Sequence, residues 1–509
     1  MMGIGKLCLP CALALACTGP GAVGPGTGGK EAARARNVVL FIGDGMGVST
    51  VTAARILEGQ LRGQPGEEGW LAFERLPHVA LVKTYNTNQQ VSDSAGTATA
   101  MLSGVKTRAG VINVTPDAPR GLPTRPEQRL TTLFEQAEAR GLATGVVTTT
   151  RFTHATPAAA YAKISERDWE SDADLSAEAA AAGVRDIALQ FVEFAAGDGL
   201  EVALGGGRAQ FRPETSPDPE HPEQRGQRGD GRDLVAEWLA GAPDRHFVWN
   251  AEDFAALDPA RGGQWLGLFE PSHMQWEAHR AKDPAGEPSL AEMTRAALAR
   301  LERHEAGYVL MVEAGRIDHG HHASSAFLAL HDTVELSRAV AAALEQVDLD
   351  ETLVVVTADH SHVFTLAGYP TRGNPILGLA RGNDERGAPS GEPLLDATGR
   401  PYTTLGYANG PGYPGASDMQ PEGPKRFPHF PQKVEGVTQG RPDLSAVDTT
   451  DPAYLQESTV PFIAETHAGE DVPLYADGPG AHRFGGVREQ SYVYHAIVEA
   501  LGWEAGSPR

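Results

Sequence analysis

Cysteine is almost absent from this 509-residue chain, and its three cysteines, Cys8, Cys11 and Cys17, all lie within the first 17 residues. Cleavage of an N-terminal leader would leave at most one thiol, which excludes a framework of intramolecular disulfides. Basic residues are also scarce, because 43 Lys and Arg stand against 66 Asp and Glu, a formal charge of −23. This balance argues against nucleic-acid binding, which depends on clustered cations.

Long apolar runs are missing too, so no segment after the leader predicts a transmembrane helix. Residues 1–17 carry Lys6 and then an apolar run over 7–16, the pattern of a signal peptide. We therefore expect export across the inner membrane to the periplasm or cell surface. Residues 13–17 also resemble a bacterial lipoprotein box, so plain cleavage and a lipid anchor at Cys17 both stay open. Residues 18–35 are Gly- and Pro-rich, as in a flexible tether, and 36–505 form the predicted domain.

Five short apolar runs end in acidic or imidazole side chains. Continuous runs of this kind are typical of buried strands in a largely parallel sheet. Helical patterns lie between them, over 131–140 and 332–346, which predicts a doubly wound α/β fold with helices on both faces of the sheet. Ligands bind such folds at the carboxyl ends of the strands. The runs are 38–42 before Asp44, 145–148 before His154, 308–312 before Glu313 and Asp318, 353–356 before Asp359 and His360, and 460–464 before His467.

The stretch between His362 and His467 is rich in Gly, Pro, Tyr and Asn. It predicts an inserted, loop-rich subdomain at approximately 368–440. A second loop-rich insertion is expected over about 208–233.

Pairs of carboxylate and imidazole side chains follow two of the predicted strands. Such pairs are the ligand mix that zinc favours, although one pair alone is usually an ordinary hydrogen-bonded pair. Here Asp359-His360 and the 318–322 motif are joined by Asp44, Glu313 and His467. Burying so many ionisable groups without an ion would be costly, so together they indicate a metal centre.

Residues 93–100 place Ser94 before a run of small residues. One interpretation is a tightly packed helix with an Asp or Ser cap. The other places Ser94 at a helix N-terminus, where backbone N–H groups and the helix dipole favour an anion such as phosphate. The segment alone leaves both interpretations open.

Five segments of the chain, in this order, resemble the signature segments of the alkaline phosphatase family. They are residues 93–100, 148–157, 313–322, 357–364 and 465–471, within a similarity that runs from about Asn37 to Trp503. The resemblance implies hydrolysis of small-molecule phosphate monoesters through a phosphoserine formed on Ser94. It also implies a crown-like insertion and a homodimer, to which the region after Tyr369 could supply contacts.

The same resemblance implies two zinc ions and one magnesium ion. It assigns Asp318, His322 and His467 to the first zinc, Asp44, Asp359 and His360 to the second, and Asp44, Thr156 and Glu313 to magnesium. It makes Arg167 the phosphate clamp and places Asp93, His154, His319 and His362 around these groups. His154 and His319 match the animal branch, since many bacterial members carry Asp and Lys there. His362 either orients a ligand or is an ordinary buried histidine.

The animal-type enzymes suggest a fourth ion, calcium, held by Glu220, the Phe269 carbonyl, Glu270 and Glu287. Glu287 stands where an aspartate is usual. Oxygen donors in loops suit calcium. The alternative is a coincidental group of solvated glutamates in an acidic chain.

Two other kinds of function stay open. One is a phosphodiesterase or sulfatase on the same fold, although no cysteine follows the leader to serve a sulfatase. The other is a non-catalytic lipoprotein that binds phosphate or metal.

Overall fold

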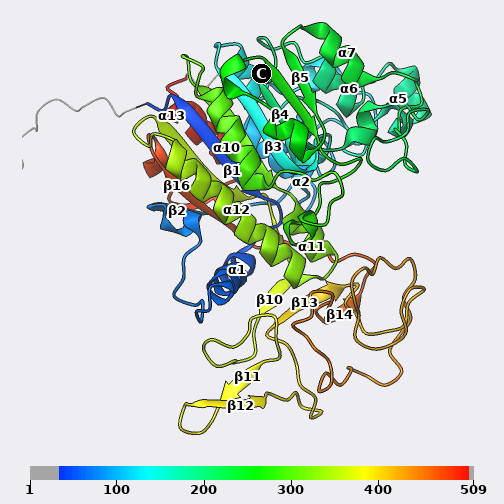
Figure 1. Ribbon diagram of the computed structural model, residues 1–509, viewed down its shortest axis with the longest axis vertical. Helices are drawn as coiled ribbons and strands as arrows, with labels where there is room; N and C mark the ends of the chain where they lie inside the picture. The colour runs from blue at the N-terminus through cyan, green and yellow to red at the C-terminus, as the bar shows by residue number, and fades with distance from the viewer. Residues whose placement is uncertain (1–33, 504–509) are drawn as a thin grey trace, which may run out of the picture.

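The computed structural model describes residues 34–503 (Figure 1). The predicted leader, Cys17 and nearly all of the tether lie outside the described residues. Within the described part, no helix is both long and apolar enough to span a membrane.

A ten-stranded sheet runs through the larger lobe in the order β17-β2-β16-β8-β1-β7-β3-β4-β6-β5. All neighbouring strands from β8 to β5 pair in parallel, and β16 is antiparallel to both β8 and β2. The strands are β1 (Asn37–Gly43), β2 (His78–Lys83), β3 (Ala143–Arg151), β4 (Val202–Gly206), β5 (Arg245–Val248), β6 (Gln264–Leu268), β7 (Tyr308–Ala314), β8 (Thr352–Ala358), β16 (Val472–Asp477) and β17 (Gly486–Glu489).

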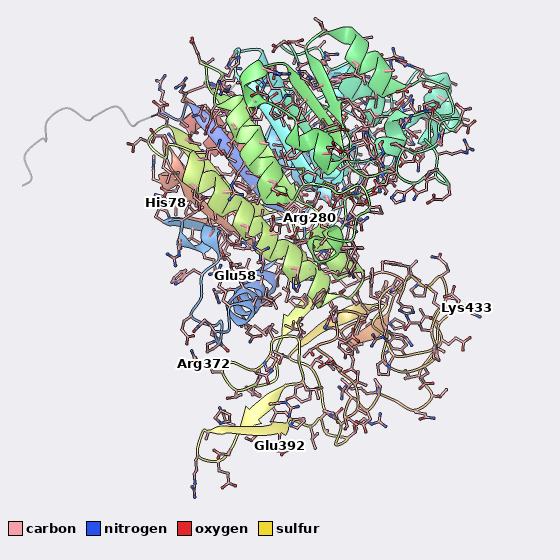
Figure 2. All side chains as sticks on the ribbon, viewed as in Figure 1. Glu58, His78, Arg280, Arg372, Glu392 and Lys433 are labelled. Atoms are coloured by element: carbon pink, nitrogen blue, oxygen red, sulfur yellow. The ribbon has the colours of Figure 1, made fainter. Side chains whose placement is uncertain are left out.

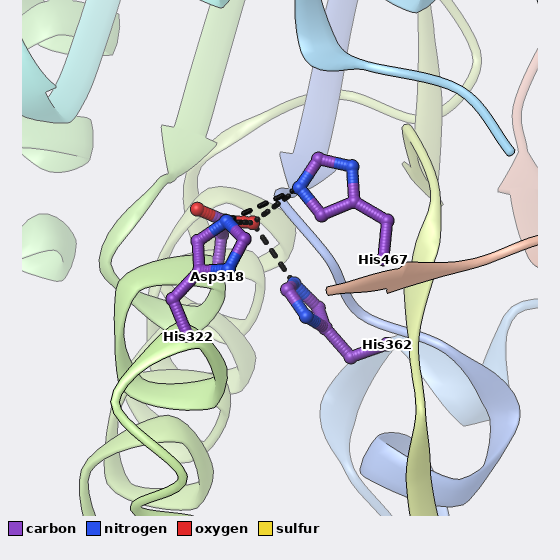
Figure 3. A group of neighbouring side chains, drawn as sticks. All are labelled: Asp318, His322, His362 and His467. Carbon is purple, nitrogen blue, oxygen red and sulfur yellow. Dashed lines mark hydrogen bonds and ion pairs between the residues drawn. The ribbon is translucent and has the colours of Figure 1, made fainter. Parts of the chain in front are cut away.

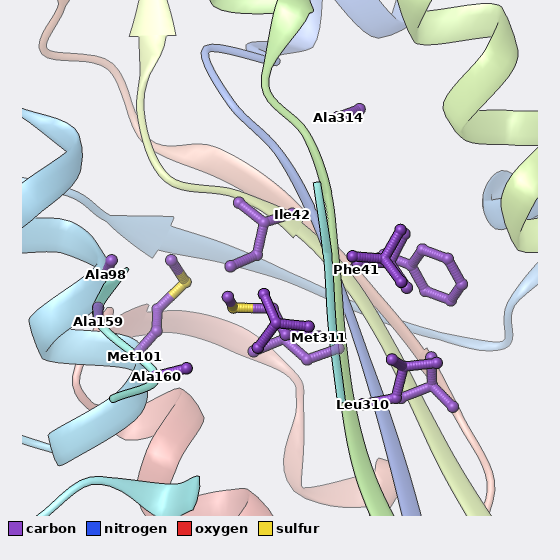
Figure 4. Packing of buried hydrophobic residues seen from close by; sticks show 14 of the residues in the cluster. Phe41, Ile42, Ala98, Met101, Ala159, Ala160, Leu310, Met311 and Ala314 are labelled. Carbon is purple, nitrogen blue, oxygen red and sulfur yellow. The ribbon is translucent and has the colours of Figure 1, made fainter. Parts of the chain in front are cut away.

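Helices cover both faces of this sheet, as expected for a doubly wound fold. In Figure 1, α10 and α12 lie across one face, while α4 packs against β3, β7 and α2 on the other. Figure 4 shows the resulting alternation: Ile42 points toward Ala98 and Met101 of α2, and Phe41 points to the opposite side. Both β1 residues are fully buried. A parallel strand with two covered faces has no polar side, which explains its unbroken apolar sequence.

The helices agree with the predicted alternation, although their bounds differ from the patterns. The 332–346 pattern belongs to a longer helix, because Ser325 caps α12 and accepts a hydrogen bond from the Leu328 backbone N–H. The helices are α1 (Val48–Leu61), α2 (Ser94–Ser103), α3 (Leu133–Glu138), α4 (Ala155–Ala158), α5 (Ala177–Ala181), α6 (Ile187–Val192), α7 (Leu234–Gly241), α8 (Ala251–Ala255), α9 (Glu277–Arg280), α10 (Leu290–Leu301), α11 (Arg316–His322), α12 (Ala326–Gln346) and α13 (Tyr492–Ala500).

A smaller, loop-rich lobe projects from the larger one (Figure 1). It contains a three-stranded sheet of β10 (Phe364–Leu366), β13 (Leu405–Gly410) and β14 (Ser458–Pro461), and a two-stranded sheet of β11 (Arg381–Asn383) and β12 (Pro389–Pro393). The segment predicted as an insertion, 368–440, lies inside it. Arg372, labelled in Figure 2, joins the lobes through two 2.6 Å contacts with Glu68.

One strand prediction is wrong. Residues 460–464 are not a buried strand of the main sheet, because β14 is an edge strand that pairs, within residues 34–503, with β13 alone, and Val460, Phe462 and Ile463 are about half exposed. Pro461 lacks the N–H that a central strand would need, and such residues are confined to sheet edges.

Candidate active site

Most of the predicted ligands meet at the carboxyl edge of the main sheet because they end or follow neighbouring parallel strands, whereas His467 reaches them on the short strand β15 (His467–Ala468), which pairs with β9 (Ser361–His362). Asp44 follows β1, Asp318 and His322 lie on α11 after β7, and Asp359 and His360 follow β8. Gly45 makes this approach possible: it has φ +72°, and a Cβ there would lie 2.4 Å from His362 Nε2. A side chain at position 45 would therefore displace the ring.

Asp318 is the centre of an imidazole cluster (Figure 3). Its Oδ1 lies 3.3 Å from Nε2 of both His322 and His467, and those two Nε2 atoms are 3.2 Å apart. The Nδ1–H of His322 donates to the Glu465 carbonyl and that of His467 to the Ser92 carbonyl. With Nδ1 engaged in each ring, the two Nε2 atoms face each other and the Asp318 carboxylate. A cation between them is the arrangement that this donor set fits.

His362 joins this cluster in a different way. Its Nε2 lies 2.9 Å from Asp318 Oδ1 and its Nδ1 lies 2.5 Å from Glu465 Oε2. Burial alone would lower the pKa of this ring, but Glu465 and Asp318 raise it to about 10. His362 therefore contacts Asp318 through one nitrogen and Glu465 through the other.

A second group surrounds His360, whose Nε2 lies 3.4 Å from Asp44 Oδ1, 3.3 Å from Asp359 Oδ2 and 3.3 Å from Ser94 Oγ. Neither carboxylate oxygen of Asp44 has a hydrogen-bond partner among the described residues, although the residue is fully buried. Burial, and then the neighbouring Asp359 and Asp318, raise the pKa of Asp44 well above its ordinary value. A carboxylate left in this way fits a metal ligand.

The third group consists of oxygen donors and one histidine. Ligand atoms of Asp44, His154 and Glu313 lie within 4.8 Å of one another. Glu313 Oε2 accepts from the hydroxyls of Thr148 and Thr150, whereas Glu313 Oε1 and Thr156 Oγ1 have no partner among the described residues. The family resemblance places His154 around the metal groups, but its ring nitrogen is close enough to Asp44 and Glu313 to share a metal ion with them.

Ser94 begins α2, and Asp93 caps that helix by accepting from the Gly96 N–H. Asp93 also holds Arg167, since its Oδ2 lies 3.2 Å from Arg167 Nη1. Arg167 Nη2 lies 3.0 Å from His154 Nε2. A helix N-terminus and a fixed guanidinium therefore lie on either side of Asp93, and both attract anions.

An acidic group lies away from these residues, in the loops predicted to hold calcium. Ligand atoms of Glu270, Asp283 and Glu287 lie within 4.8 Å of one another, as do those of Glu220, His221 and Glu270. Glu287 is 4% exposed, and its Oε2 has no partner among the described residues. Burial and the neighbouring carboxylates raise the pKa of Glu287 to about 9 and that of Asp283 to about 7. Phe269 directly precedes Glu270.

Three residues of these groups were not identified from the sequence as site residues: Glu465, His221 and Asp283. Glu465 and Asp283 reach their sites through loops, so no strand end marks them. Their only signal was sequence proximity, Glu465 to His467 and Asp283 to Glu287.

The doubly wound sheet and the carboxylate–imidazole groups at its carboxyl edge define a metal-binding α/β protein. The alkaline phosphatase family model matches residues 35–503. An alkaline phosphatase of Gadus morhua is 45% identical over 473 residues, which are 92% of this chain and 92% of that protein. The tissue-nonspecific isozyme of Homo sapiens is 44% identical over 474 residues, covering 92% of this chain and 83% of that protein.

Solved structures agree with this fold. Alkaline phosphatase from Thermus thermophilus has a TM-score of 0.64 at 26% identity and covers 94% of this chain and 93% of its own. The enzyme from the Antarctic bacterium TAB5 has a TM-score of 0.59 at 21% identity, with 93% and 100% coverage, and one of its mutants was solved with Mg bound in a site called M3.

The chain belongs to the alkaline phosphatase family. It is a phosphoric monoester hydrolase, so neither the diesterase and sulfatase alternatives nor the non-catalytic one is needed.

Proposed function

We propose that this enzyme hydrolyses phosphate monoesters through a phosphoserine on Ser94. The supporting observation is the position of Ser94, which is buried at the first residue of α2 with its Oγ 3.3 Å from His360 Nε2. In the first step a bond forms between Ser94 Oγ and phosphorus, and the ester oxygen leaves as the alcohol. Water then cleaves the phosphoserine and releases inorganic phosphate.

We assign the two imidazole-containing groups to zinc and the Asp44, Thr156 and Glu313 group to magnesium. Asp318, His322 and His467 would hold one zinc ion, and Asp44, Asp359 and His360 the other. Nitrogen and carboxylate donors suit zinc, whereas oxygen donors suit magnesium. When bound, such ions lower the pKa of a coordinated hydroxyl and neutralise charge on phosphoryl and leaving-group oxygens.

The chain's own groups bind and orient the phosphoryl group. Helix α2 begins at Ser94, so the backbone N–H groups of its first turn lie beside a phosphoryl group bound to Ser94. The Arg167 guanidinium can hold two phosphoryl oxygens. Burial and the nearby Arg167 keep the pKa of His154 well below its ordinary value, so this ring is neutral and accepts from Arg167. The guanidinium is therefore already oriented when phosphate arrives, so less ordering is lost on binding the phosphoryl group.

Ser94→Ala tests the nucleophile. We expect turnover to fall to near background while metal content and melting temperature stay those of the parent, because no ligand is removed. Ser103→Ala, at the other end of α2, is the matched control, since it loses only a hydrogen bond to the Thr99 carbonyl. Wild-type steady-state rates in Ser94→Ala would remove Ser94 from the mechanism. Labelled phosphate should be trapped on Ser94 at low pH in the parent alone.

We also propose that the acidic group takes a calcium ion, with Asp283 added to Glu220, Glu270, Glu287 and the Phe269 carbonyl. The support is the unpartnered oxygens of Asp283 and Glu287 and the two overlapping sets that share Glu270. Gln275 holds two of the ligands, since its Nε2 lies 2.6 Å from Glu270 Oε1 and its N–H donates to Glu287 Oε1.

We propose further that the enzyme is exported, and that Cys17 decides between release and a lipid anchor. Membrane fractionation of the wild type and of Cys17→Ala tests this. Loss of the membrane-bound fraction in Cys17→Ala supports the anchor, and an unchanged distribution excludes it.

We also propose a homodimer, supported by Tyr369, which is 94% exposed on the smaller lobe, and by an apolar sheet edge considered below.

A further inference from the structure

The loop between Glu270 and α9 brings a third imidazole, His273, beside His154 and His319. The ring centroids of His273 and His319 are 4.2 Å apart, and that of His154 lies 5.4 Å from His273 and 5.7 Å from His319. His273 belongs to none of the candidate metal groups of the described residues. Its position therefore needs another explanation.

His154 depends on neighbouring rings for its orientation. Its Nε2 contacts Arg167, but its buried Nδ1 has no hydrogen-bond partner among the described residues. A ring held at one nitrogen can still swing about that contact. The edge-on rings of His273 and His319, at 79° and 70° to it, restrict this movement.

His273 is itself fixed on its far side. Its Nε2 lies 2.6 Å from Arg151 Nη1, and its Nδ1 lies 3.1 Å from the Arg151 backbone nitrogen. Arg151 is in turn paired with Glu170 through contacts of 2.8 Å and 2.5 Å. Strand β3, which ends at Arg151, thus supports His273, and His273 supports His154.

We propose that His273 is a positioning residue: by packing its ring against His154, it holds the Arg167 guanidinium in the orientation that binds the phosphoryl group. The proposal rests on the phosphate-binding role proposed above for Arg167. His273 does not touch the reacting atoms, so its effect should be on phosphate affinity.

Inhibition by inorganic phosphate measures this effect. We expect His273→Ala to raise the inhibition constant and KM by the same factor, about fivefold, comparable to one lost uncharged hydrogen bond. The turnover number should not fall, and metal content should not change. His273→Phe keeps the ring but loses the nitrogen contacts with Arg151, so we expect it to restore part of the phosphate affinity that His273→Ala loses. His279→Ala is the matched control, since that ring contacts Trp276 and Phe427 instead.

A double-mutant cycle with Arg167→Ala separates this proposal from the one on which it rests. We expect His273→Ala to have no further effect on phosphate affinity once Arg167 is removed. If Arg167→Ala alone leaves phosphate inhibition unchanged, the role of Arg167 is wrong, and the His273 proposal goes with it. If Arg167→Ala weakens inhibition but His273→Ala acts equally in both backgrounds, only the His273 proposal is overturned. A His273→Phe variant as weak as His273→Ala would likewise overturn the packing argument.

Discussion

His360 is the side chain on which the second proposed zinc site depends, because its Nε2 faces Asp44, Asp359 and Ser94 at once. We expect His360→Ala to lose one zinc ion per chain, because two carboxylates alone do not close a zinc site. Turnover should fall about 100-fold or more, the upper effect of disturbing a ligand's surroundings. Metal analysis alongside the phosphatase assay checks this. His331→Ala, on α12, is the control, and unchanged zinc stoichiometry in His360→Ala would refute the assignment.

Glu138 should make stability depend on pH, because it is buried near Glu201, and both carboxylates accept hydrogen bonds from Thr144 of β3. Burial, with a contribution from Glu201, raises the pKa of Glu138 from 4.5 to about 8. Between these two values the unfolded chain has lost a proton that the folded protein retains. The free energy of unfolding therefore falls as pH rises through this range and levels off above it.

Glu138→Gln removes this dependence, since the amide does not titrate. We expect its melting temperature to fall less than that of the parent between about pH 5 and about pH 9. Glu345→Gln, an exposed position on α12, should follow the parent profile. If the melting temperatures of Glu138→Gln and of the parent fall equally as pH rises, Glu138 is ionised in the folded protein.

Local patterns identified side chains that directly follow a strand, Arg167 on a loop was assigned only through the family resemblance, and Glu465 and His273 on loops were missed. Asp44 and Asp359 belong to motifs at strand ends, where topology alone brings them together. Glu465 reaches His362 only because the smaller lobe returns the chain to the main sheet. His273 meets His154 only because a loop after β6 folds back over β3. Such contacts depend on chain reversals that no local pattern encodes.

The segment between β6 and α10 connects the acidic group with the proposed phosphate-binding residues. It carries Glu270, Asp283 and Glu287, and also His273, which packs beside His154. We expect calcium to stabilise chelated protein beyond zinc and magnesium, by about 2.7 kcal/mol at a hundredfold excess over Kd. Asp283→Asn should lose most of this gain, because it removes a charged oxygen donor. Thermal melts with and without calcium measure it.

Glu223→Gln is the matched control for that experiment. Its carboxylate lies 3.9 Å from His221 but is 72% exposed, outside the buried group. A calcium-dependent gain in Asp283→Asn equal to that of the parent would exclude Asp283 as a ligand. No gain in any variant, the parent included, would remove the calcium site.

Element predictions succeeded where both faces of a strand are covered and failed at the lobe boundary. The runs at 38–42 and 308–312 became β1 and β7, whose apolar sequences match full burial. The run at 460–464 is also apolar, but its first residues lie in the edge strand β14 of the smaller lobe. Apolar character alone does not separate these cases, whereas Pro461 in the run is a local signal against a central strand.

At the level of the whole molecule, the described residues leave one face of the main sheet exposed at its β17 end. Val79 and Leu81 of β2 are 52% and 41% exposed, and Val487 of β17, which pairs with Leu81, is 53% exposed. An apolar strip at a sheet edge is a liability for a lone monomer. A second copy of the chain that packs against this strip would bury its apolar side chains. The net charge of −23 makes the copies repel one another elsewhere, which disfavours less specific contacts.

We therefore expect the protein to have twice the monomer mass in solution and Leu81→Glu to dissociate it. A carboxylate buried in the apolar centre of an interface has no partner there, so its desolvation opposes association. Light scattering after size exclusion, over a range of protein concentrations, measures the mass. Leu239→Glu, a substitution of an exposed leucine on α7 at the far side of the sheet, should leave the dimer intact. A monomeric parent would reject the dimer itself. A Leu81→Glu variant that dimerises as tightly as the parent would instead place the interface elsewhere, with the smaller lobe around Tyr369 as the next surface to substitute.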